Sequence, residues 1–293
     1  MTPTIPGFEY HRVPVADGVR LHVAVGGSGS PVVLLHGFPQ THLMWRHVAA
    51  GLAERHTVIC PDLRGYGDSD KPAEDVDGST YAKRTMAADV VELARILGHD
   101  RFALAGHDRG ALVALRTALD HPGAVTHLLS LDVLPTLDMW DVMHGTTAAV
   151  GFHLYLMAQP PGLPEQLIGA APDAFFGHFL DIWTRDTAAI PADVRAAYLK
   201  ASREAVPSIV ADYRASAHID VEHDRADRDA GNRLTMPVSV LQQDWGSALG
   251  FDAAALWRAW APDLDHRTVS CGHFMAEEDP AVVGGALRDL LDR

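Results

Sequence analysis

The sequence has little cysteine and no long hydrophobic run. Its two thiols, Cys60 and Cys271, lie in apolar stretches typical of strands. We therefore expect reduced core thiols rather than a disulfide framework. No apolar run approaches the roughly 18 residues of a membrane span, and no basic segment followed by an apolar one opens the sequence. These absences predict a cytoplasmic protein that has no membrane partner.

Positive charge is also scarce. The 293 residues carry 24 Lys and Arg against 38 Asp and Glu, a net charge of −14. Such an acidic chain disfavours nucleic acid as a partner. The 17 histidines show no H-E-x-x-H spacing, and no C-x-x-C or phosphate-binding G-x-x-x-x-G-K-[ST] motif is present. We expect no metal and no cofactor, and a small molecule as the ligand.

Strand-like and helix-like segments alternate along much of the sequence. Short apolar runs are typical of buried strands, and apolar residues spaced three or four apart are typical of helices packed on a sheet. This alternation predicts an α/β fold with a mostly parallel, doubly wound sheet. The predicted strands are 19–25, 31–35, 57–60, 101–105, 125–134, 237–241 and 266–270, and the predicted helices include 85–97, 111–116 and 281–291.

The pattern changes between about residues 136 and 235. This stretch is helical in character, is broken by several prolines and holds many aromatic residues. It is too long for a simple loop. We interpret it as a helical cap inserted into a core domain that comprises residues 1–135 and 236–293. Ligands bind at the carboxyl ends of the strands in open α/β sheets, so the cap is expected to cover that edge.

The most informative motif is Gly106-His107-Asp108-Arg109-Gly110. A predicted strand precedes it and a predicted helix follows it, which is the context of the G-x-nucleophile-x-G elbow of α/β hydrolases. The nucleophile position holds Asp rather than Ser. A carboxylate that attacks a saturated carbon displaces a halide or opens an epoxide, and leaves an alkyl ester that water can cleave. The motif therefore predicts an α/β-hydrolase fold and alkyl-transfer hydrolysis.

Two further residues complete a catalytic triad in the chain order of α/β hydrolases. His273 follows the last predicted strand and is predicted to activate the water that cleaves the ester. Asp132 ends the apolar strand segment Leu128-Leu129-Ser130-Leu131 and is predicted to orient His273. Asp244, after the strand at 237–241, is a rival for this role. We favour Asp132 on the geometry of the strand ends.

An oxyanion loop is indicated by His36-Gly37-Phe38-Pro39, which follows a predicted strand. The backbone N–H groups of Phe38 and Arg109 are predicted to stabilise the oxyanion that forms when the ester is hydrolysed. A tight structural turn is an alternative interpretation of His36 and Pro39, and it is compatible with the first.

Taken together, these motifs resemble the haloacetate (fluoroacetate) dehalogenases, a family beside the epoxide hydrolases. The resemblance implies that Arg109 binds a substrate carboxylate, which suits a guanidinium. A salt bridge from Arg109 to an acidic cap residue is the alternative. The resemblance also implies a homodimer. It rests on HGFPQ (36–40), DLRGYGDSD (62–70), GHDRGA (106–111), LDVLPT (131–136), AQP (158–160), DYRA (212–215) and GHFMAE (272–277).

The sequence departs from the family pattern at two substrate-binding positions. Leu112 stands where the family has a second Arg, and Leu154 stands where it has Trp after the cap His. Of the family's three donors to the departing halide, His153 and Tyr213 remain. Loss of such a donor costs about 3 kcal/mol. The departures favour a larger or less acidic substrate than fluoroacetate. Packed core residues are the alternative interpretation of His153 and Tyr213.

Three functions follow from this pattern. Hydrolytic dehalogenation of a 2-haloacid is favoured by Arg109. Epoxide hydrolysis by the same nucleophile is the alternative, with Tyr213 or His153 as the donor to the ring oxygen. A non-catalytic ligand receptor is disfavoured because Asp108 and His273 are both present.

Overall fold

The computed structural model describes residues 3–293, apart from the side chains at positions 246 and 247. Within this part of the chain one eight-stranded sheet has the order β1-β2-β4-β3-β5-β6-β7-β8. The strands are β1 (Glu9–Pro14), β2 (Arg20–Gly27), β3 (Ser30–Leu35), β4 (His56–Pro61), β5 (Phe102–His107), β6 (Val125–Leu131), β7 (Val238–Gln242) and β8 (Leu264–Thr268).

The sheet is parallel from β4 to β8 and antiparallel at the β1–β2 edge. β4 pairs with one side of β3 and β5 with the other, so the direction of winding reverses between β3 and β5. In doubly wound sheets the carboxyl ends of the strands at such a reversal form the ligand crevice. The loop after β3 carries Phe38, and the loop after β5 carries Asp108.

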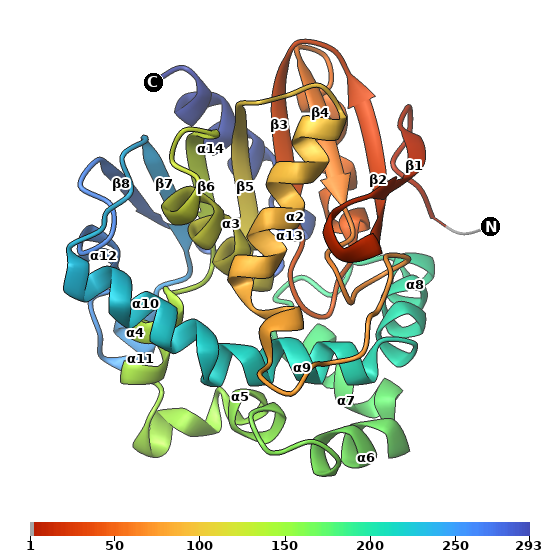
Figure 1. Ribbon diagram of the computed structural model, residues 1–293, viewed down its shortest axis with the longest axis vertical. Helices are drawn as coiled ribbons and strands as arrows, with labels where there is room; N and C mark the ends of the chain where they lie inside the picture. Colours follow the sequence, from red (N-terminus) through yellow and green to blue (C-terminus); the bar gives the residue numbers. More distant parts are fainter. Residues whose placement is uncertain (1–2) are drawn as a thin grey trace.

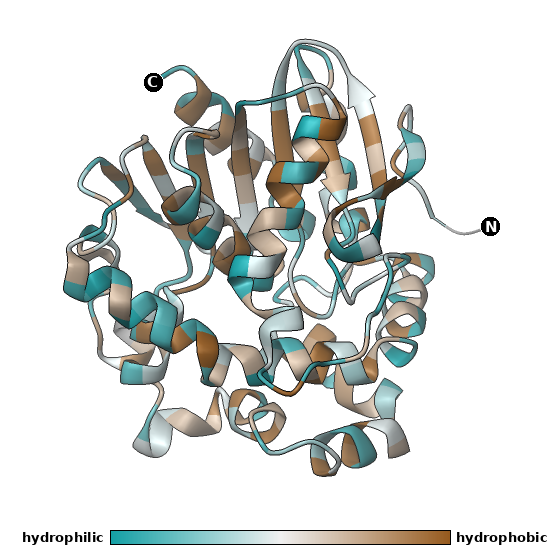
Figure 2. Ribbon diagram, in the orientation of Figure 1, coloured by the Kyte–Doolittle hydropathy of each residue, from teal (hydrophilic) through white to brown (hydrophobic). Residues whose placement is uncertain are grey.

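Helices cover both faces of the sheet (Figure 1). Residues of α2, α3 and α12 belong to the hydrophobic cluster on one face, and residues of α1, α13 and α14 belong to the cluster on the other. The central strands are largely hydrophobic, as doubly covered parallel strands are (Figure 2). These helices are α1 (Arg46–Leu52), α2 (Lys83–Ile96), α3 (Arg109–Asp120), α12 (Ala253–Arg258), α13 (Met275–Glu278) and α14 (Pro280–Leu291).

A group of helices between β6 and β7 in the chain lies across the ends of the strands, and we refer to it as the cap (Figure 1). It comprises α4 (Thr136–Val142), α5 (Phe152–Met157), α6 (Leu163–Ala170), α7 (Pro172–Ile182), α8 (Ala192–Arg203), α9 (Val206–Ala217) and α10 (Ile219–Ala230). Short helices elsewhere are η1 (Ala16–Gly18), η2 (His42–Trp45), η3 (Ser79–Tyr81) and α11 (Trp245–Leu249), and η4 (Gly145–Ala149) lies within the cap. None of the described helices is both long and apolar enough to cross a membrane.

The structure corrects three strand predictions. β6 ends at Leu131 rather than at 134, because Asp132 adopts a φ of 52° that leaves the extended conformation. β8 spans Leu264–Thr268 rather than 266–270. β1 was not predicted, since this edge strand is mostly exposed and has no apolar run. The first correction matters for function, because the turn at Asp132 carries its side chain out of the strand.

Candidate active site

Asp108 occupies a strained turn between β5 and α3. Its φ of 48° and ψ of −117° are unusual for a residue with a side chain. The two flanking glycines permit the tight turn. A Cβ on Gly106 would lie 2.4 Å from the Gly110 carbonyl oxygen, and a Cβ on Gly110 would lie 2.4 Å from that of His36. The turn therefore presents the Asp108 carboxylate at the edge of the sheet, where it lines a cavity.

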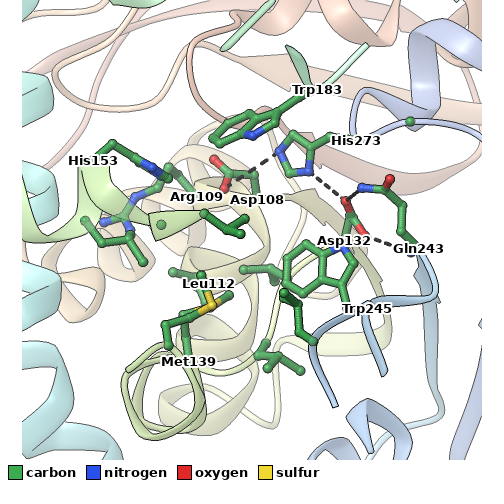
Figure 3. A pocket seen from close by; sticks show the side chains of 18 of the residues that line it. Asp108, Arg109, Leu112, Asp132, Met139, His153, Trp183, Gln243, Trp245 and His273 are labelled. Atoms are coloured by element: carbon green, nitrogen blue, oxygen red, sulfur yellow. Dashed lines mark hydrogen bonds and ion pairs between the residues drawn. The ribbon is translucent and has the colours of Figure 1, made fainter. Parts of the chain in front are cut away.

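His273 stands between two carboxylates (Figure 3). Its Nδ1 lies 2.7 Å from Asp132 Oδ2, and its Nε2 lies 4.0 Å from Asp108 Oδ2. The Asp132 carboxylate also accepts hydrogen bonds from the backbone N–H and side-chain amide of Gln243, at 2.9 and 2.7 Å. Asp244 lines a neighbouring cavity instead. The structure thus brings Asp108, Asp132 and His273 together.

The charges around His273 make it a stronger base than an ordinary imidazole. Burial disfavours the protonated ring, but the hydrogen bond and charge of Asp132, together with the charge of Asp108, outweigh this effect. The pKa of His273 is consequently raised above its usual value. A base of this kind is suited to taking a proton from water close to neutral pH.

Backbone contacts fix the loop that carries His273. Its N–H donates to the Trp183 carbonyl at 2.9 Å, and its own carbonyl lies 2.8 Å from His107 Nε2. Burial holds the pKa of His107 well below the usual value, so His107 is neutral, and its Nε2–H donates to this carbonyl. The backbone of His273 is therefore held from the elbow side and from the cap side.

The two oxygens of Asp108 have different environments. The Phe38 N–H donates to Oδ1 at 2.8 Å, while Oδ2 faces His273. The second predicted oxyanion donor, the Arg109 N–H, belongs to the first residue of α3, where backbone donors have no partner within the helix. Oδ1 is therefore engaged by the Phe38 N–H, and Oδ2 is the oxygen directed toward His273.

The Arg109 side chain is bound to the cap. Its Nε lies 2.7 Å from Asp212 Oδ2, and its Nη2 donates to the Asp212 carbonyl and to Ser216 Oγ. The guanidinium also lies over the Tyr213 ring, 4.1 Å from the centroid. Within the described residues Nη1 makes no such bond. In the structure Arg109 thus forms the salt bridge to an acidic cap residue that was the alternative prediction, and its side chain also lines the cavity.

Asp212 belongs to a buried cluster whose charges balance. Lys83 forms an ion pair with Asp212 and lies 3.4 Å from Asp220, and the Tyr66 hydroxyl donates to Asp212 at 2.6 Å. Lys83, Arg109, Asp212 and Asp220 are each no more than 3% exposed. Two cations face two carboxylates, so the positive charge of Arg109 is already neutralised.

Three aromatic side chains of the cap approach Asp108. The His153 ring centroid lies 5.6 Å from that of Tyr213 and 5.2 Å from that of Trp183. The Tyr213 hydroxyl and His153 Nδ1 are buried, and among the described residues they have no hydrogen-bond partner. Burial and the nearby Arg109 lower the pKa of His153 to about 3, so its ring is neutral. Burial and the Asp108 charge raise the pKa of Tyr213 well above the usual value, which keeps its hydroxyl protonated.

The cavity above Asp108 has a volume of about 550 Å³. It is bounded by the triad residues, by the cap and by α11. The remaining predicted substrate-binding residues, Leu112 and Leu154, both line it. Most of the other lining side chains are apolar. A cavity of this size accommodates a ligand much larger than a two-carbon acid.

Comparison with known proteins identifies the architecture. The model of the α/β hydrolase fold matches residues 30–280, which include the elbow, Asp132 and His273. The chain belongs to the α/β-hydrolase family. It is 38% identical to a fluoroacetate dehalogenase of a Burkholderia species over 97% of this chain and 94% of that protein. It is 36% identical to the soluble epoxide hydrolase of Corynebacterium strain C12, over 93% and 94% of the two chains.

Solved structures agree with the family assignment. The ALR0039 protein of Nostoc sp PCC 7120, assigned to the α/β hydrolases, superposes on this hydrolase with a TM-score of 0.94. The two are 38% identical, and the match covers 98% of this chain and 99% of that one. The protein is therefore an enzyme of the α/β-hydrolase superfamily. Its relatives include both dehalogenases and epoxide hydrolases.

One group of side chains in the described part of this hydrolase has the composition of a metal site. His22, His42 and Asp62 offer donor atoms within 4.8 Å of one another. His42 Nδ1 is already 2.7 Å from Asp62 Oδ1, and the carboxylate accepts the backbone N–H groups of His42 and Asp68. None of the three lines the cavity. We interpret the group as a structural tie that holds the loop after β4.

Some residues of the site carried no clear signal in the sequence. Trp183 was one aromatic among many in the cap, yet it lines the cavity against both His153 and His273. Gln243 lay at the end of a strand without a motif. Asp212 stood within DYRA, a segment matched to the family, but only the fold reveals that its partners are Arg109 and Lys83.

Proposed function

We propose that this α/β hydrolase opens neutral epoxides through a covalent ester on Asp108 and releases vicinal diols. The observation that carries the choice of substrate is the ion pair between Arg109 and Asp212. A substrate carboxylate would have to compete with Asp212 for the guanidinium while it lay beside the Asp108 carboxylate. A neutral epoxide meets neither obstacle.

In the first step, Asp108 Oδ2 attacks an epoxide carbon from the cavity. The new C–O bond forms as the ring C–O bond breaks, and the electron pair goes to the ring oxygen. The Tyr213 hydroxyl is protonated and has no hydrogen-bond partner in the described part of the chain, so it can donate to this oxygen, with neutral His153 as a second donor. Preorganised donors of this kind typically contribute two to three orders of magnitude in rate.

In the second step, water cleaves the ester. His273 Nε2 takes a proton from the water as its oxygen attacks Cγ of Asp108, and Asp132 stabilises the imidazolium. The negative charge that forms on Oδ1 is stabilised by the Phe38 N–H, which already donates to this atom. Collapse of the intermediate expels the diol oxygen, which takes the proton from His273. The second water proton leaves the new Asp108 carboxyl and replaces the proton that Tyr213 gave to the ring oxygen, so that Asp108 and Tyr213 are both restored.

Hydrolysis of a 2-haloacid is the second candidate. It is favoured by Arg109 Nη1, whose N–H groups remain available in the described structure, and by the similarity to a fluoroacetate dehalogenase. Asp108 would attack the carbon that carries the halogen, and halide would leave toward His153, Tyr213 and Trp183. Leu112 and Leu154 supply neither the second cation nor the adjacent indole of the family pattern. Larger chloro acids would suit the cavity better than fluoroacetate.

The test is product formation from styrene oxide, chloroacetate and fluoroacetate, measured side by side as diol and as free halide. We expect diol formation to have the highest kcat/KM, and Asp108→Asn and Asp108→Ala to abolish every product. Tyr213→Phe should lower epoxide turnover by two to three orders of magnitude. His273→Gln should accumulate the alkyl ester, visible as a mass increase of the intact protein equal to that of the substrate.

The outcomes separate the candidates. Halide release faster than diol formation would overturn the choice of substrate and leave the Asp108 chemistry standing. Turnover without any ester in His273→Gln would overturn the covalent mechanism. Undiminished ligand binding by Asp108→Asn, with no turnover by the natural protein, would indicate a receptor instead.

A further inference from the structure

The cavity of this hydrolase extends well beyond the reacting groups. Asp108, His153 and Trp183 mark the reaction end, and Leu112, Met139 and Trp245 lie on the other side of Asp108 (Figure 3). We refer to this second part as the apolar arm. It is formed by Leu112, Leu134, Met139, Met143, Trp245 and Leu249.

Separate elements contribute these side chains. Leu112 belongs to α3, Met139 belongs to α4, and Trp245 belongs to α11. The Trp245 ring packs edge-on against Phe251, at 6.5 Å between centroids. A rigid indole and two flexible methionines therefore line the same arm, and methionine adapts its shape to irregular apolar ligands.

The six residues of the arm carry no charge that would bind an acidic group. Placing a carboxylate or phosphate among them would remove its water without replacement. The cations that do line the cavity are Arg109, whose charge is balanced by Asp212, and Arg185, whose Nη1 is bound to the Ser270 carbonyl. An apolar substituent fits the arm, and an acidic one does not.

We infer that the apolar arm is the binding site for the substituent of a terminal epoxide, namely a straight alkyl chain or an aryl ring several carbons long. The inference rests on the proposed function, because it places the epoxide ring at Asp108 and the substituent along Leu112 toward Trp245. A two-carbon substrate would leave most of the 550 Å³ without contacts.

A homologous series of epoxides measures the arm directly. Burial of each methylene is expected to raise kcat/KM about fourfold while the chain stays within the arm. From 1,2-epoxybutane to 1,2-epoxyoctane, which adds four methylenes, the total gain is then about 250-fold. Met139→Trp narrows the arm and should lower the ratio of kcat/KM for epoxyoctane to that for epoxybutane at least tenfold. Ile96→Trp, on the exposed side of α2, introduces the same residue and should leave the ratio unchanged.

Binding of the diol products gives a second readout that does not depend on turnover. Affinity measured by calorimetry should rise from 1,2-butanediol to 1,2-octanediol in the natural protein and in Asp108→Asn, and Met139→Trp should reduce this rise. If neither epoxide turnover nor diol affinity depended on chain length, the apolar arm would not be the binding site of the substituent. The proposed function would remain intact. Diol affinities that rise with length, in a protein that forms no Asp108 ester, would overturn the function and retain the arm.

Discussion

The guanidinium of Arg109 is held by the carboxylate of Asp212, with 2.7 Å between Nε and Oδ2. The first residue belongs to the elbow of the core and the second to cap helix α9. The pair therefore fixes the cap to the core and removes a free positive charge from the cavity. Both consequences can be tested.

Removing the Asp212 charge should destabilise the protein. Asp212→Asn leaves Arg109 and Lys83 without their shared partner in a buried site, and breaking such a pair typically costs 3–5 kcal/mol. Urea denaturation should show this loss. Asp173→Asn removes one partner of an exposed ion pair with Arg203, and we expect no resolvable change from it. Equal stability of the two variants would contradict the role given to the cluster.

Supplying a second cation should shift substrate preference toward acids. Leu112→Arg places a guanidinium in the cavity beside Arg109, and a charged hydrogen bond to a carboxylate contributes about 1.5–3 kcal/mol. We expect kcat/KM for chloroacetate to rise about tenfold or more and that for styrene oxide to fall. Leu112→Met conserves volume and is the control. An unchanged ratio between the two substrates in Leu112→Arg would show that residue 112 does not select them.

The identity of the triad acid can be settled with two matched variants. Asp132→Asn removes the charge 2.7 Å from His273 Nδ1, and kcat should fall by roughly 10⁴-fold, as in other triads. Asp244→Asn should lower kcat less than tenfold. Steady-state kinetics on the best substrate decides between them. A larger loss of kcat in Asp244→Asn than in Asp132→Asn would show that Asp244 is the triad acid.

Ester hydrolysis should slow in acid. His273 activates water only when its ring is neutral, and its pKa is raised above the usual value by Asp132 and Asp108 despite burial. The rate should therefore fall about tenfold per pH unit below a midpoint that lies above about 6.5. Ester formation does not use this base. Enzyme that reacts with substrate at pH 5 and is then quenched should consequently carry more alkyl ester, by mass spectrometry, than enzyme that reacts at pH 8. Equal amounts of ester at the two pH values would contradict the role of His273 as the base of ester hydrolysis alone.

The sequence was most informative where function depends on local geometry. The pentapeptide around Asp108 predicted the strand-to-helix elbow because strand, glycine and helix signals are adjacent there. The positions of Asp132 and His273 followed from strand ends, since the carboxyl ends of parallel strands meet at one edge. The proximity of the three side chains could then be anticipated without the fold.

The partners of Arg109 could not be predicted in the same way. The sequence left open a substrate carboxylate or a cap acid, because the choice depends on how α9 lies across α3. Asp212 is about a hundred residues away along the chain, and Lys83 contributes from a third helix. The apolar arm could not be predicted either, since Met139 of α4 and Trp245 of α11 are far apart in the sequence and line one cavity only in the folded protein.

Asp212 and Tyr213 are neighbours in α9, so a single turn of helix both anchors the cap and positions a hydroxyl above Asp108. A cap transplanted from a relative would have to match Lys83 and Arg109 of this core, or its hydroxyl would be displaced together with its anchor. Exchange of a whole cap between relatives of this architecture is thus expected to disturb the site. Diversification of substrate range is expected to proceed through substitutions at positions such as 112, 139 and 154, which border the cavity but lie outside the anchor.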